Sequence, residues 1–341
     1  MTINLSTVQS VSVSKPPDIP GLRFRGYRGE ADHPAMSAVI CGSKDADGLE
    51  STQTPEEVDC AYRHLVNSDP RRDMLFAEVD GEVVGYSRVW WNLDKTGIRL
   101  YQHFVHLLPV WRTDGLRQMM LGHNERRLRE IAAGHPDDGP RFFEAWAADT
   151  ESHWVSVLEG AEYKAVRHGY SMVRPDLENI PDLPLPEGLE VRSIEPELVP
   201  VVWAAAREGF RDEWSYSEDE WSDDKLREFQ EWPAYDPGLW QVAWDGDQVA
   251  GMVLNFVDRA ENEEYGRQRG YTEGICVRRP WRRRGLAKAL IARSFRMHRE
   301  LGMTEAALGV DAENPNGALQ LYKSMGFQVV KRYTTYRKPL E

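Results

Sequence analysis

The chain has 341 residues, a length that fits two domains better than one. Its net charge is −13 at pH 7, with 28% charged and 41% hydrophobic residues. This balance is typical of a globular protein and argues against nucleic acid as the main partner. No apolar run approaches the roughly 18 residues that a membrane span needs, so we expect no membrane partner.

The N-terminal segment lacks the basic start and apolar block of a secretory signal. We predict that residues 1–20 are a disordered lead-in. The three cysteines, Cys41, Cys60 and Cys276, are widely spaced and fit a reducing, cytoplasmic location better than a disulfide framework. His103 and His106 have no further ligands near them in the sequence, so we predict no metal site.

The sequence repeats itself. WRTDGL at residues 111–116 resembles WRRRGL at residues 281–286, which follows 170 residues later. Upstream of each, at residues 75–86 and 239–252, Asp-Gly separates two runs of strand formers, which predicts a hairpin. The repeat predicts two similar domains, at residues 21–176 and 188–341, joined by a proline-rich linker at residues 177–187.

The second half predicts a clear order of elements. A strand at residues 190–193 precedes acidic, Trp-rich helical sequence up to residue 232. Strands follow in the 239–252 hairpin and at residues 270–277, then a helix at 286–302, a strand at 305–310, a helix starting near Pro315 and a final hairpin. This order predicts an α+β fold in which a mixed, mainly antiparallel twisted sheet is flanked by helices.

An arginine-rich run at residues 278–284 stands out in this acidic chain. A strand ends at Val277, and Gly285 opens an amphipathic helix. Free N–H groups and the dipole at such a helix start form an anion site, and glycine lets a ligand approach the backbone. A solvated basic patch or a nucleic-acid contact is the alternative, but the flanking strand, glycine and helix favour a small phosphate-bearing ligand.

These residues carry a resemblance. RRRGLA at 282–287 is similar to the GNAT pyrophosphate signature Gln/Arg-x-x-Gly-x-Gly/Ala, and DAENPNGALQLYKSMGF at 311–327 resembles the second GNAT signature. From residue 22 to the end the chain resembles two tandem GNAT domains, far more closely in the second, in a plan similar to that of mycothiol synthases. The resemblance implies acetyl-CoA as cosubstrate, with its pantetheine arm and pyrophosphate held by Ile275, Cys276, Val277, Arg282, Arg283, Arg284, Gly285, Leu286, Ala287, Lys288 and Asn314.

Three residues have two interpretations each. Asn314 precedes Pro315 and is either a helix N-cap or a cofactor contact. Tyr322 lies on an apolar helical stripe typical of a core, whereas the resemblance implies a general acid for the CoA thiolate. Proton transfer from tyrosine (pKa about 10) to a thiolate (about 8.5) is uphill by roughly 2 kcal/mol, so a hydrogen bond is the safer description. Glu273 is either the general base that the resemblance implies or an ordinary strand glutamate.

The acidic, Trp-rich stretch at residues 208–232 lies where GNAT folds form the acceptor pocket. It either receives a cationic amine or is a solvated helix face. The first half departs from the pattern, because Asp114 replaces an arginine, Arg117 replaces the small residue, and Leu158 aligns with Tyr322. His103 aligns with Glu273. We therefore predict that only the second half is catalytic.

The sequence thus predicts an acetyl-CoA-dependent N-acetyltransferase acting on a small amine. The alternatives are a mycothiol synthase-like acetyltransferase, a non-catalytic acyl-CoA-binding or scaffold protein, and a nucleic-acid-binding protein. The acceptor, the acyl chain and the oligomeric state stay open.

Overall fold

The computed structural model describes residues 11, 17–50, 52–113 and 115–341. Most of the predicted lead-in, residues 1–10 and 12–16, therefore lies outside the described residues. Its described part is not a disordered lead-in. The Val11 N–H donates to the Phe24 carbonyl at 3.2 Å, and Ile19 packs against a hydrophobic core.

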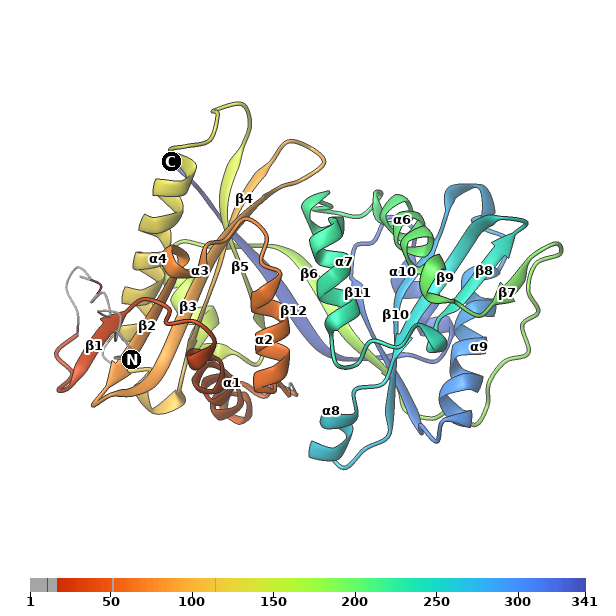
Figure 1. Cartoon of the computed structure of the whole chain (residues 1–341), viewed down its shortest axis with the longest axis horizontal. Helices are drawn as coiled ribbons and strands as arrows, with labels where there is room; N and C mark the ends of the chain where they lie inside the picture. Colours follow the sequence, from red (N-terminus) through yellow and green to blue (C-terminus); the bar gives the residue numbers. More distant parts are fainter. Residues whose placement is uncertain (1–10, 12–16, 51, 114) are drawn as a thin grey trace, which may run out of the picture. The chain divides into compact units, whose positions relative to one another are not determined.

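The chain divides into two compact units, each with helices packed on a sheet (Figure 1). Unit 1 comprises Met1–Val166 and Thr334–Glu341, and unit 2 comprises Arg167–Tyr333. The predicted boundary at residues 177–187 is therefore displaced, and the last eight residues return to unit 1. The cause is strand pairing. Strand β6 (Lys164–Arg174) pairs with a unit 2 strand from Gly169 onward, and the Leu340 N–H donates to Arg141 in unit 1.

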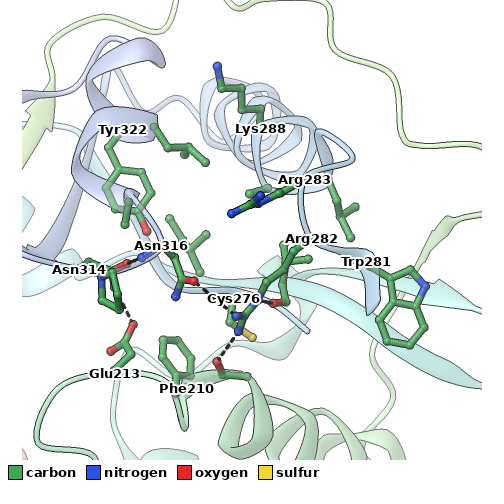
Figure 2. A pocket seen from close by; sticks show the side chains of 18 of the residues that line it. Phe210, Glu213, Cys276, Trp281, Arg282, Arg283, Lys288, Asn314, Asn316 and Tyr322 are labelled. Carbon is green, nitrogen blue, oxygen red and sulfur yellow. Dashed lines mark hydrogen bonds between the residues drawn. The ribbon is translucent and has the colours of Figure 1, made fainter. Parts of the chain in front are cut away.

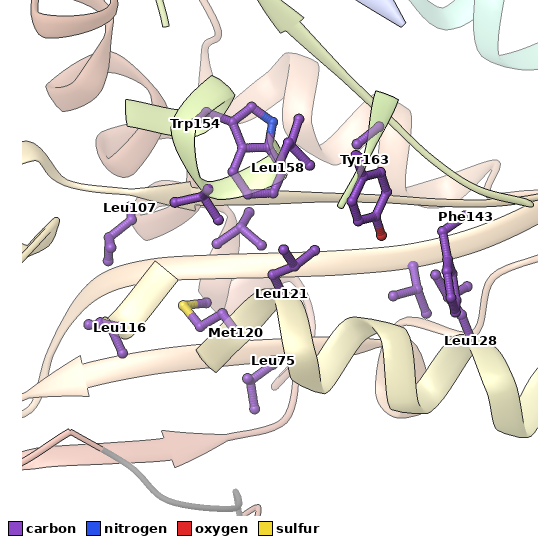
Figure 3. Packing of buried hydrophobic residues seen from close by; sticks show 14 of the residues in the cluster. Leu75, Leu107, Leu116, Met120, Leu121, Leu128, Phe143, Trp154, Leu158 and Tyr163 are labelled. Atoms are coloured by element: carbon purple, nitrogen blue, oxygen red, sulfur yellow. The ribbon is translucent and has the colours of Figure 1, made fainter. Parts of the chain in front are cut away.

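Unit 1 contains a sheet in the order β1-β2-β3-β4-β5. All neighbours are antiparallel except β4 and β5, which run parallel. Its elements are β1 (Leu22–Arg25), α1 (His33–Asp47), α2 (Pro55–Arg63), α3 (Pro70–Asp73), β2 (Met74–Val79), β3 (Glu82–Leu93), β4 (Arg99–Leu107), α4 (Leu116–Ala132), β5 (Arg141–Ala148) and α5 (Ser152–Gly160). In its core, side chains of α4 and α5 pack with Leu75 and Leu107 of the sheet (Figure 3).

Unit 2 repeats this plan with the order β6-β11-β10-β9-β8-β7, in which only β10 and β11 run parallel. Its further elements are β7 (Glu190–Arg192), α6 (Val199–Phe210), α7 (Asp223–Glu231), β8 (Gln241–Asp245), β9 (Gln248–Phe256), α8 (Arg259–Glu264), β10 (Arg269–Val277), α9 (Leu286–Glu300), β11 (Glu305–Asp311) and α10 (Ala318–Ser324). One core lies between the sheet and α9, and another lies on the face that α6 covers. The predicted α+β class with mixed, mainly antiparallel sheets is confirmed.

Two local predictions are wrong. The final hairpin is a single twelve-residue strand, β12 (Gln328–Pro339), because its run of β formers contains no turn residue. The helix expected near Pro315 begins at Ala318, after Gly317 at φ 75°. Among the described residues, no helix is long and apolar enough to cross a membrane.

Candidate active site

A cleft lies beside the C-terminal end of β10, whose residues Ile275, Cys276 and Val277 line it. The parallel strands β10 and β11 pair from Arg269 to Tyr271 on the β10 side and no further. Beyond that point β10 carries a bulge, because its register with β9 shifts between Glu273 and Cys276 and Gly274 adopts φ 55°. A bulge inserts an unpaired residue and bends the strand, and glycine tolerates the positive φ. The bulge was not predicted, although an isolated glycine within a strand pattern is its usual signal.

Helix α9 starts at the mouth of this cleft. Its N-cap, Gly285, has φ 86°, and no side chain caps the helix. The N–H groups of the first turn lack intrahelical partners by geometry, so they and the helix dipole favour an anion. Arg283, at φ 62°, and Lys288 lie beside this terminus in Figure 2. The predicted anion site is therefore sterically and electrostatically feasible.

A pocket with a cavity volume of about 410 Å³ joins this helix start to α10. Its lining includes most of the predicted cofactor residues, namely Ile275, Cys276, Val277, Arg282, Arg283, Gly285, Leu286, Ala287, Lys288 and Asn314, together with Tyr322. Two predicted site residues do not line it. Arg284 instead donates to the Glu187 carbonyl at 3.4 Å. Glu273 lies in β10, two residues before Ile275. Gly209, Phe210 and Glu213, from the stretch at residues 208–232, also line the pocket, as does Trp281, which was not predicted.

Arg282 ties the pocket walls together. Its Nε donates to the Val277 carbonyl at 2.8 Å, and its Nη1 donates to Asp212 Oδ2 at 2.7 Å. Hydrogen bonds from Arg279 and Arg282 hold the pKa of Asp212 well below its usual range. We call this pair of Arg282 and Asp212 the Arg–Asp clamp. The repeat in the sequence, in which Arg112 matches Arg282, was a signal for it. In unit 1, Arg112 makes the same bond to Leu107 and a bidentate pair with Asp47 at 2.6 and 2.7 Å.

Asn314 is not a helix N-cap, which corrects one of its two interpretations. Its Oδ1 accepts from the Asn316 N–H at 2.9 Å and shapes the turn that precedes α10. Its Nδ2 donates to Glu213 Oε1 at 3.3 Å, across the pocket floor seen in Figure 2. Asn314 therefore lines the pocket as part of a turn, and a cofactor contact stays a prediction.

The position of Tyr322 is compatible with both of its interpretations, and its role in catalysis stays a prediction. It is 7% exposed, packs edge-on against Phe327 and belongs to the core beside α9. Its hydroxyl nevertheless points into the pocket (Figure 2). Burial first, and then the carboxylates of Glu273 and Glu213, raise the pKa of Tyr322 well above its usual value. The phenol therefore stays protonated and is a hydrogen-bond donor at any working pH.

Glu273 spans the opening between the strands. Its Oε1 accepts the Gly309 N–H of β11 at 2.6 Å. Burial raises the pKa of Glu273 from 4.5 to about 7, and the Gly309 hydrogen bond opposes that rise. A carboxyl that titrates near neutral pH can accept a proton from a substrate and release it again, as a general base must. Cys276 cannot play this role, because burial raises the pKa of its thiol to about 12.

The corresponding cleft in unit 1 is filled. Arg117, at the position of Ala287, is buried and donates through Nε and Nη2 to the Val105 carbonyl at 3.1 and 2.8 Å. Its guanidinium also lies over the Trp154 ring at 4.6 Å. Burial lowers the pKa of Arg117 to about 10, so it remains a cation. Asp114, which replaces an arginine in the sequence comparison, lies outside the described residues.

Alignment of His103 with Glu273 needs correction. Strand β4 pairs with β3 without interruption, so it lacks the extra residue of the β10 bulge. We count back from Val277 in β10 and from Leu107 in β4 and leave out the one extra residue of the bulge. The counterpart of Glu273 is then Phe104. His103 lies on the opposite face, where its Nε2 meets the Tyr163 hydroxyl at 2.8 Å and burial lowers its pKa to about 3. Leu158 is fully buried and aligns with Tyr322, since Tyr163 and Phe327 donate equivalent backbone bonds to them.

His103 and His106 point to opposite faces of β4, because side chains alternate along a strand. They therefore cannot share a metal ion. Within the part of the chain that the structure describes, no group of three or more His, Cys, Asp or Glu side chains is placed to hold one.

Comparison with known proteins gives a family. The Acetyltransferase (GNAT) family matches residues 203–327. Mycothiol acetyltransferases of Geodermatophilus obscurus and Salinispora arenicola are 27% and 25% identical, over 86% and 90% of this chain and 90% and 94% of theirs. A GCN5-related N-acetyltransferase from Sphaerobacter thermophilus superposes with a TM-score of 0.69 at 26% identity, covering 95% of this chain and 97% of that one.

The two-unit plan also has a structural counterpart. A tandem GNAT protein from the clavulanic acid biosynthesis pathway has a TM-score of 0.67 at 13% identity and covers 93% of this chain and 98% of its own. That identity supports the fold alone. Residues 203–327 of unit 2 thus match the GNAT acetyltransferase family, whose members use acyl-CoA, and along its length the chain is similar to acetyltransferases and to a tandem GNAT fold.

Proposed function

We propose that unit 2 catalyses the acetyl-CoA-dependent N-acetylation of a small, cationic amine. The observation that carries this proposal is a single pocket that joins the uncapped N-terminus of α9 to the Tyr322 hydroxyl. An anion site and a hydrogen-bond donor for a leaving group are the two groups that an acyl-CoA thioester needs. At the equivalent positions among the described residues of unit 1, Arg117 lies buried beside the helix start and Leu158 replaces the tyrosine.

The residues present fit acetyl-CoA. The first-turn N–H groups of α9, flanked by Arg283 and Lys288, suit a pyrophosphate. The bulge at Gly274 releases the backbone of Ile275 from its pairing with β9, so its polar groups are available to the amides of a pantetheine arm. Arg282 acts as a positioning residue, because it fixes the turn through Val277 and Asp212.

Catalysis would divide between Glu273 and Tyr322. Freeing an ordinary ammonium at neutral pH costs about 4.6 kcal/mol, so the Glu273 carboxylate accepts that proton, directly or through water. The amine nitrogen then attacks the thioester carbonyl carbon, a C–N bond forms and the C–S bond breaks. As the amide forms, the nitrogen loses its second proton. The sulfur leaves with the electron pair of the C–S bond, stabilised by the Tyr322 hydroxyl, and takes up that second proton, while Glu273 releases the first proton to solvent.

The charge of the site supports a cationic acceptor. Glu213 lines the pocket, and the carboxylates of Glu213 and Glu273 both raise the pKa of Tyr322. Two carboxylates near the hydroxyl favour an ammonium over an anionic acceptor. Most of the remaining acids at residues 208–232 are exposed or paired at the surface, for example Glu218 with Arg211 at 3.2 Å.

Two measurements test the proposal. Acetyl-CoA at 100 times its dissociation constant should stabilise the protein by about 2.7 kcal/mol, seen as a rise in Tm. Release of CoA thiol with a panel of amines should then report turnover. No Tm change at millimolar acetyl-CoA would overturn the proposal, and binding without turnover across the panel would favour the acyl-CoA-binding or scaffold alternative. Binding to nucleic acid that collapses with salt would favour the arginine-run alternative.

A mycothiol-type acceptor is the second candidate. The relatives of that name align along about nine-tenths of the chain, so both units correspond. The identities of 27% and 25% leave the acceptor open. Adding the mycothiol precursor amine to the panel separates the candidates, because a mycothiol-type enzyme should prefer it to every simple amine.

A further inference from the structure

Three aromatic side chains form a strip on the face of unit 2 that α6 and α7 cover. We define it as the acceptor strip: Trp232 after α7, Phe256 on β9 and Tyr271 on β10. Phe256 and Tyr271 are directly opposite in register, and their rings stack with centroids 4.6 Å apart and planes 8° apart. Trp232 meets Phe256 edge-on at 4.6 Å. All three rings are only half-buried, so their faces are not fully used in the core.

The acceptor strip begins beside the reacting groups. Tyr271 is the last β10 residue that pairs with β11, and the β10 residues that line the pocket begin four positions further on, at Ile275. Glu273 lies two residues further on and points to the same face, about 7 Å away along the strand. An amine held at Glu273 therefore has the ring of Tyr271 next to it. The α9 side of the cleft is the side that the proposed cofactor occupies, which leaves the strip for the rest of the acceptor.

The charges beside the acceptor strip are already compensated. The Tyr271 hydroxyl and Arg267 both bind Glu261, and Arg269 pairs with Glu305 at 2.7 Å. The strip therefore offers ring faces instead of charge. Aromatic faces bind other flat rings, and the apolar C–H faces of rings, more strongly than they bind short polar chains.

From this geometry we infer the acceptor class: a primary amine whose amino group is a few atoms away from a ring with a flat apolar face. The inference rests on the proposed function. The Glu273 carboxylate takes the ammonium proton, and the acceptor strip takes the ring. Two sources share this chemistry, an arylalkylamine and an amino sugar that presents its C–H face, and the experiment separates them.

The experiment measures kcat/KM at saturating acetyl-CoA for 2-phenylethylamine, glucosamine and n-propylamine. The expected result is that at least one ring-bearing amine exceeds n-propylamine by about tenfold or more, the scale of one filled apolar subsite. Phe256→Ala and Tyr271→Ala should bring that ratio close to one by lowering kcat/KM for the ring-bearing amine, with the KM for acetyl-CoA unchanged. Tyr271→Phe keeps the ring and should keep the ratio.

Trp146→Ala is the matched control, because it removes a 40% exposed ring that stacks on Trp90 in unit 1. It should leave the ratio unchanged. Equal kcat/KM for all three amines, or a ratio that survives both alanine variants, would overturn the inference and leave the proposed function standing. Absence of turnover with every amine, together with no acetyl-CoA binding, would overturn the proposed function itself.

Discussion

The two units have the same sheet order and the same Arg–Asp clamp, yet differ at the cleft. In unit 2 the β10 bulge frees Ile275 and leaves Ala287 beside an open pocket. In unit 1, β4 has no bulge. The Arg117 guanidinium donates a hydrogen bond to the carbonyl of Val105, the residue equivalent to Ile275. The side chain that blocks the cleft thus also satisfies the backbone that a ligand would have used.

This difference teaches which parts of the repeat support the fold and which support chemistry. The clamp persists in unit 1, where its side chains are only 10% and 5% exposed, although Arg117 lies buried beside the helix start there. The glycine before the helix also persists, with φ 76° at Gly115 and 86° at Gly285. Clamp and glycine are therefore requirements of the strand–turn–helix. At the equivalent described positions, unit 1 has an uninterrupted β4, Arg117 and Leu158 in place of the bulge, the small residue and the tyrosine.

The largest expected effect separates the two helix starts. Gly285→Glu places a β-carbon at a positive φ and a negative charge at the proposed phosphate site, so acetyl-CoA stabilisation and turnover should both disappear. Gly115→Glu makes the same change in unit 1 and should leave both intact. Thermal shift with acetyl-CoA and thiol release measure the two outcomes, with circular dichroism to check folding. Turnover that survives Gly285→Glu and is lost with Gly115→Glu would place the active site in unit 1.

Glu273→Gln tests the base, for which unit 1 has only Phe104. Loss of a general base should lower turnover by about 10²- to 10⁴-fold at pH 8. In the wild type, kcat/KM should rise as the pH passes through about 7, because only the carboxylate form of Glu273 accepts a proton. The variant should lose this rise and keep any later rise that belongs to the amine. An unchanged pH profile would return Glu273 to an ordinary strand residue.

The same substitution has a predictable effect on stability. The pKa of Glu273 is raised on folding from 4.5 to about 7, so the folded state disfavours its charge. This group therefore costs stability as the pH rises from about 4.5 to above 7. Glu273→Gln should raise Tm relative to the wild type at pH 8 and change it little at pH 4, which thermal denaturation at both pH values will measure.

Tyr322→Phe removes the hydroxyl and keeps the packing against Phe327. Turnover should fall by about ten- to a thousandfold, the range for one hydrogen-bond donor or acid, while acetyl-CoA affinity stays nearly constant. Steady-state kinetics and thermal shift separate these quantities. Wild-type turnover in the variant would mean that Tyr322 serves only the core, as Leu158 does in unit 1.

The sequence predicted much of this comparison because its signals are local. Asp-Gly turns, the strand before Gly285 and the periodicity of α9 each depend on a few neighbouring residues. The chain passes from one unit to the other within β6 and again within β12. These crossings depend on pairing between residues far apart in the sequence, so no local pattern revealed them. The bulge shifted the alignment of Glu273 by one residue, and Asp212 and Glu213 approach the pocket from a loop whose path the sequence does not specify.

The smallest expected effect concerns the clamp and tests whether its two copies have different uses. Asp212→Asn removes the carboxylate that holds Arg282 and Arg279 at a partly exposed site. The proposed pyrophosphate turn should loosen, and KM for acetyl-CoA should rise about two- to fivefold, the scale of such a pair, with kcat nearly unchanged. Asp47→Asn breaks the equivalent but buried pair with Arg112, which should cost about 3–5 kcal/mol of stability and leave KM unchanged.

Titration of acetyl-CoA in the kinetic assay and thermal denaturation of both variants give the comparison. If Asp212→Asn lowers Tm as much as Asp47→Asn and leaves KM unchanged, the clamp is purely structural in both units, and Arg282 has no role in positioning the turn.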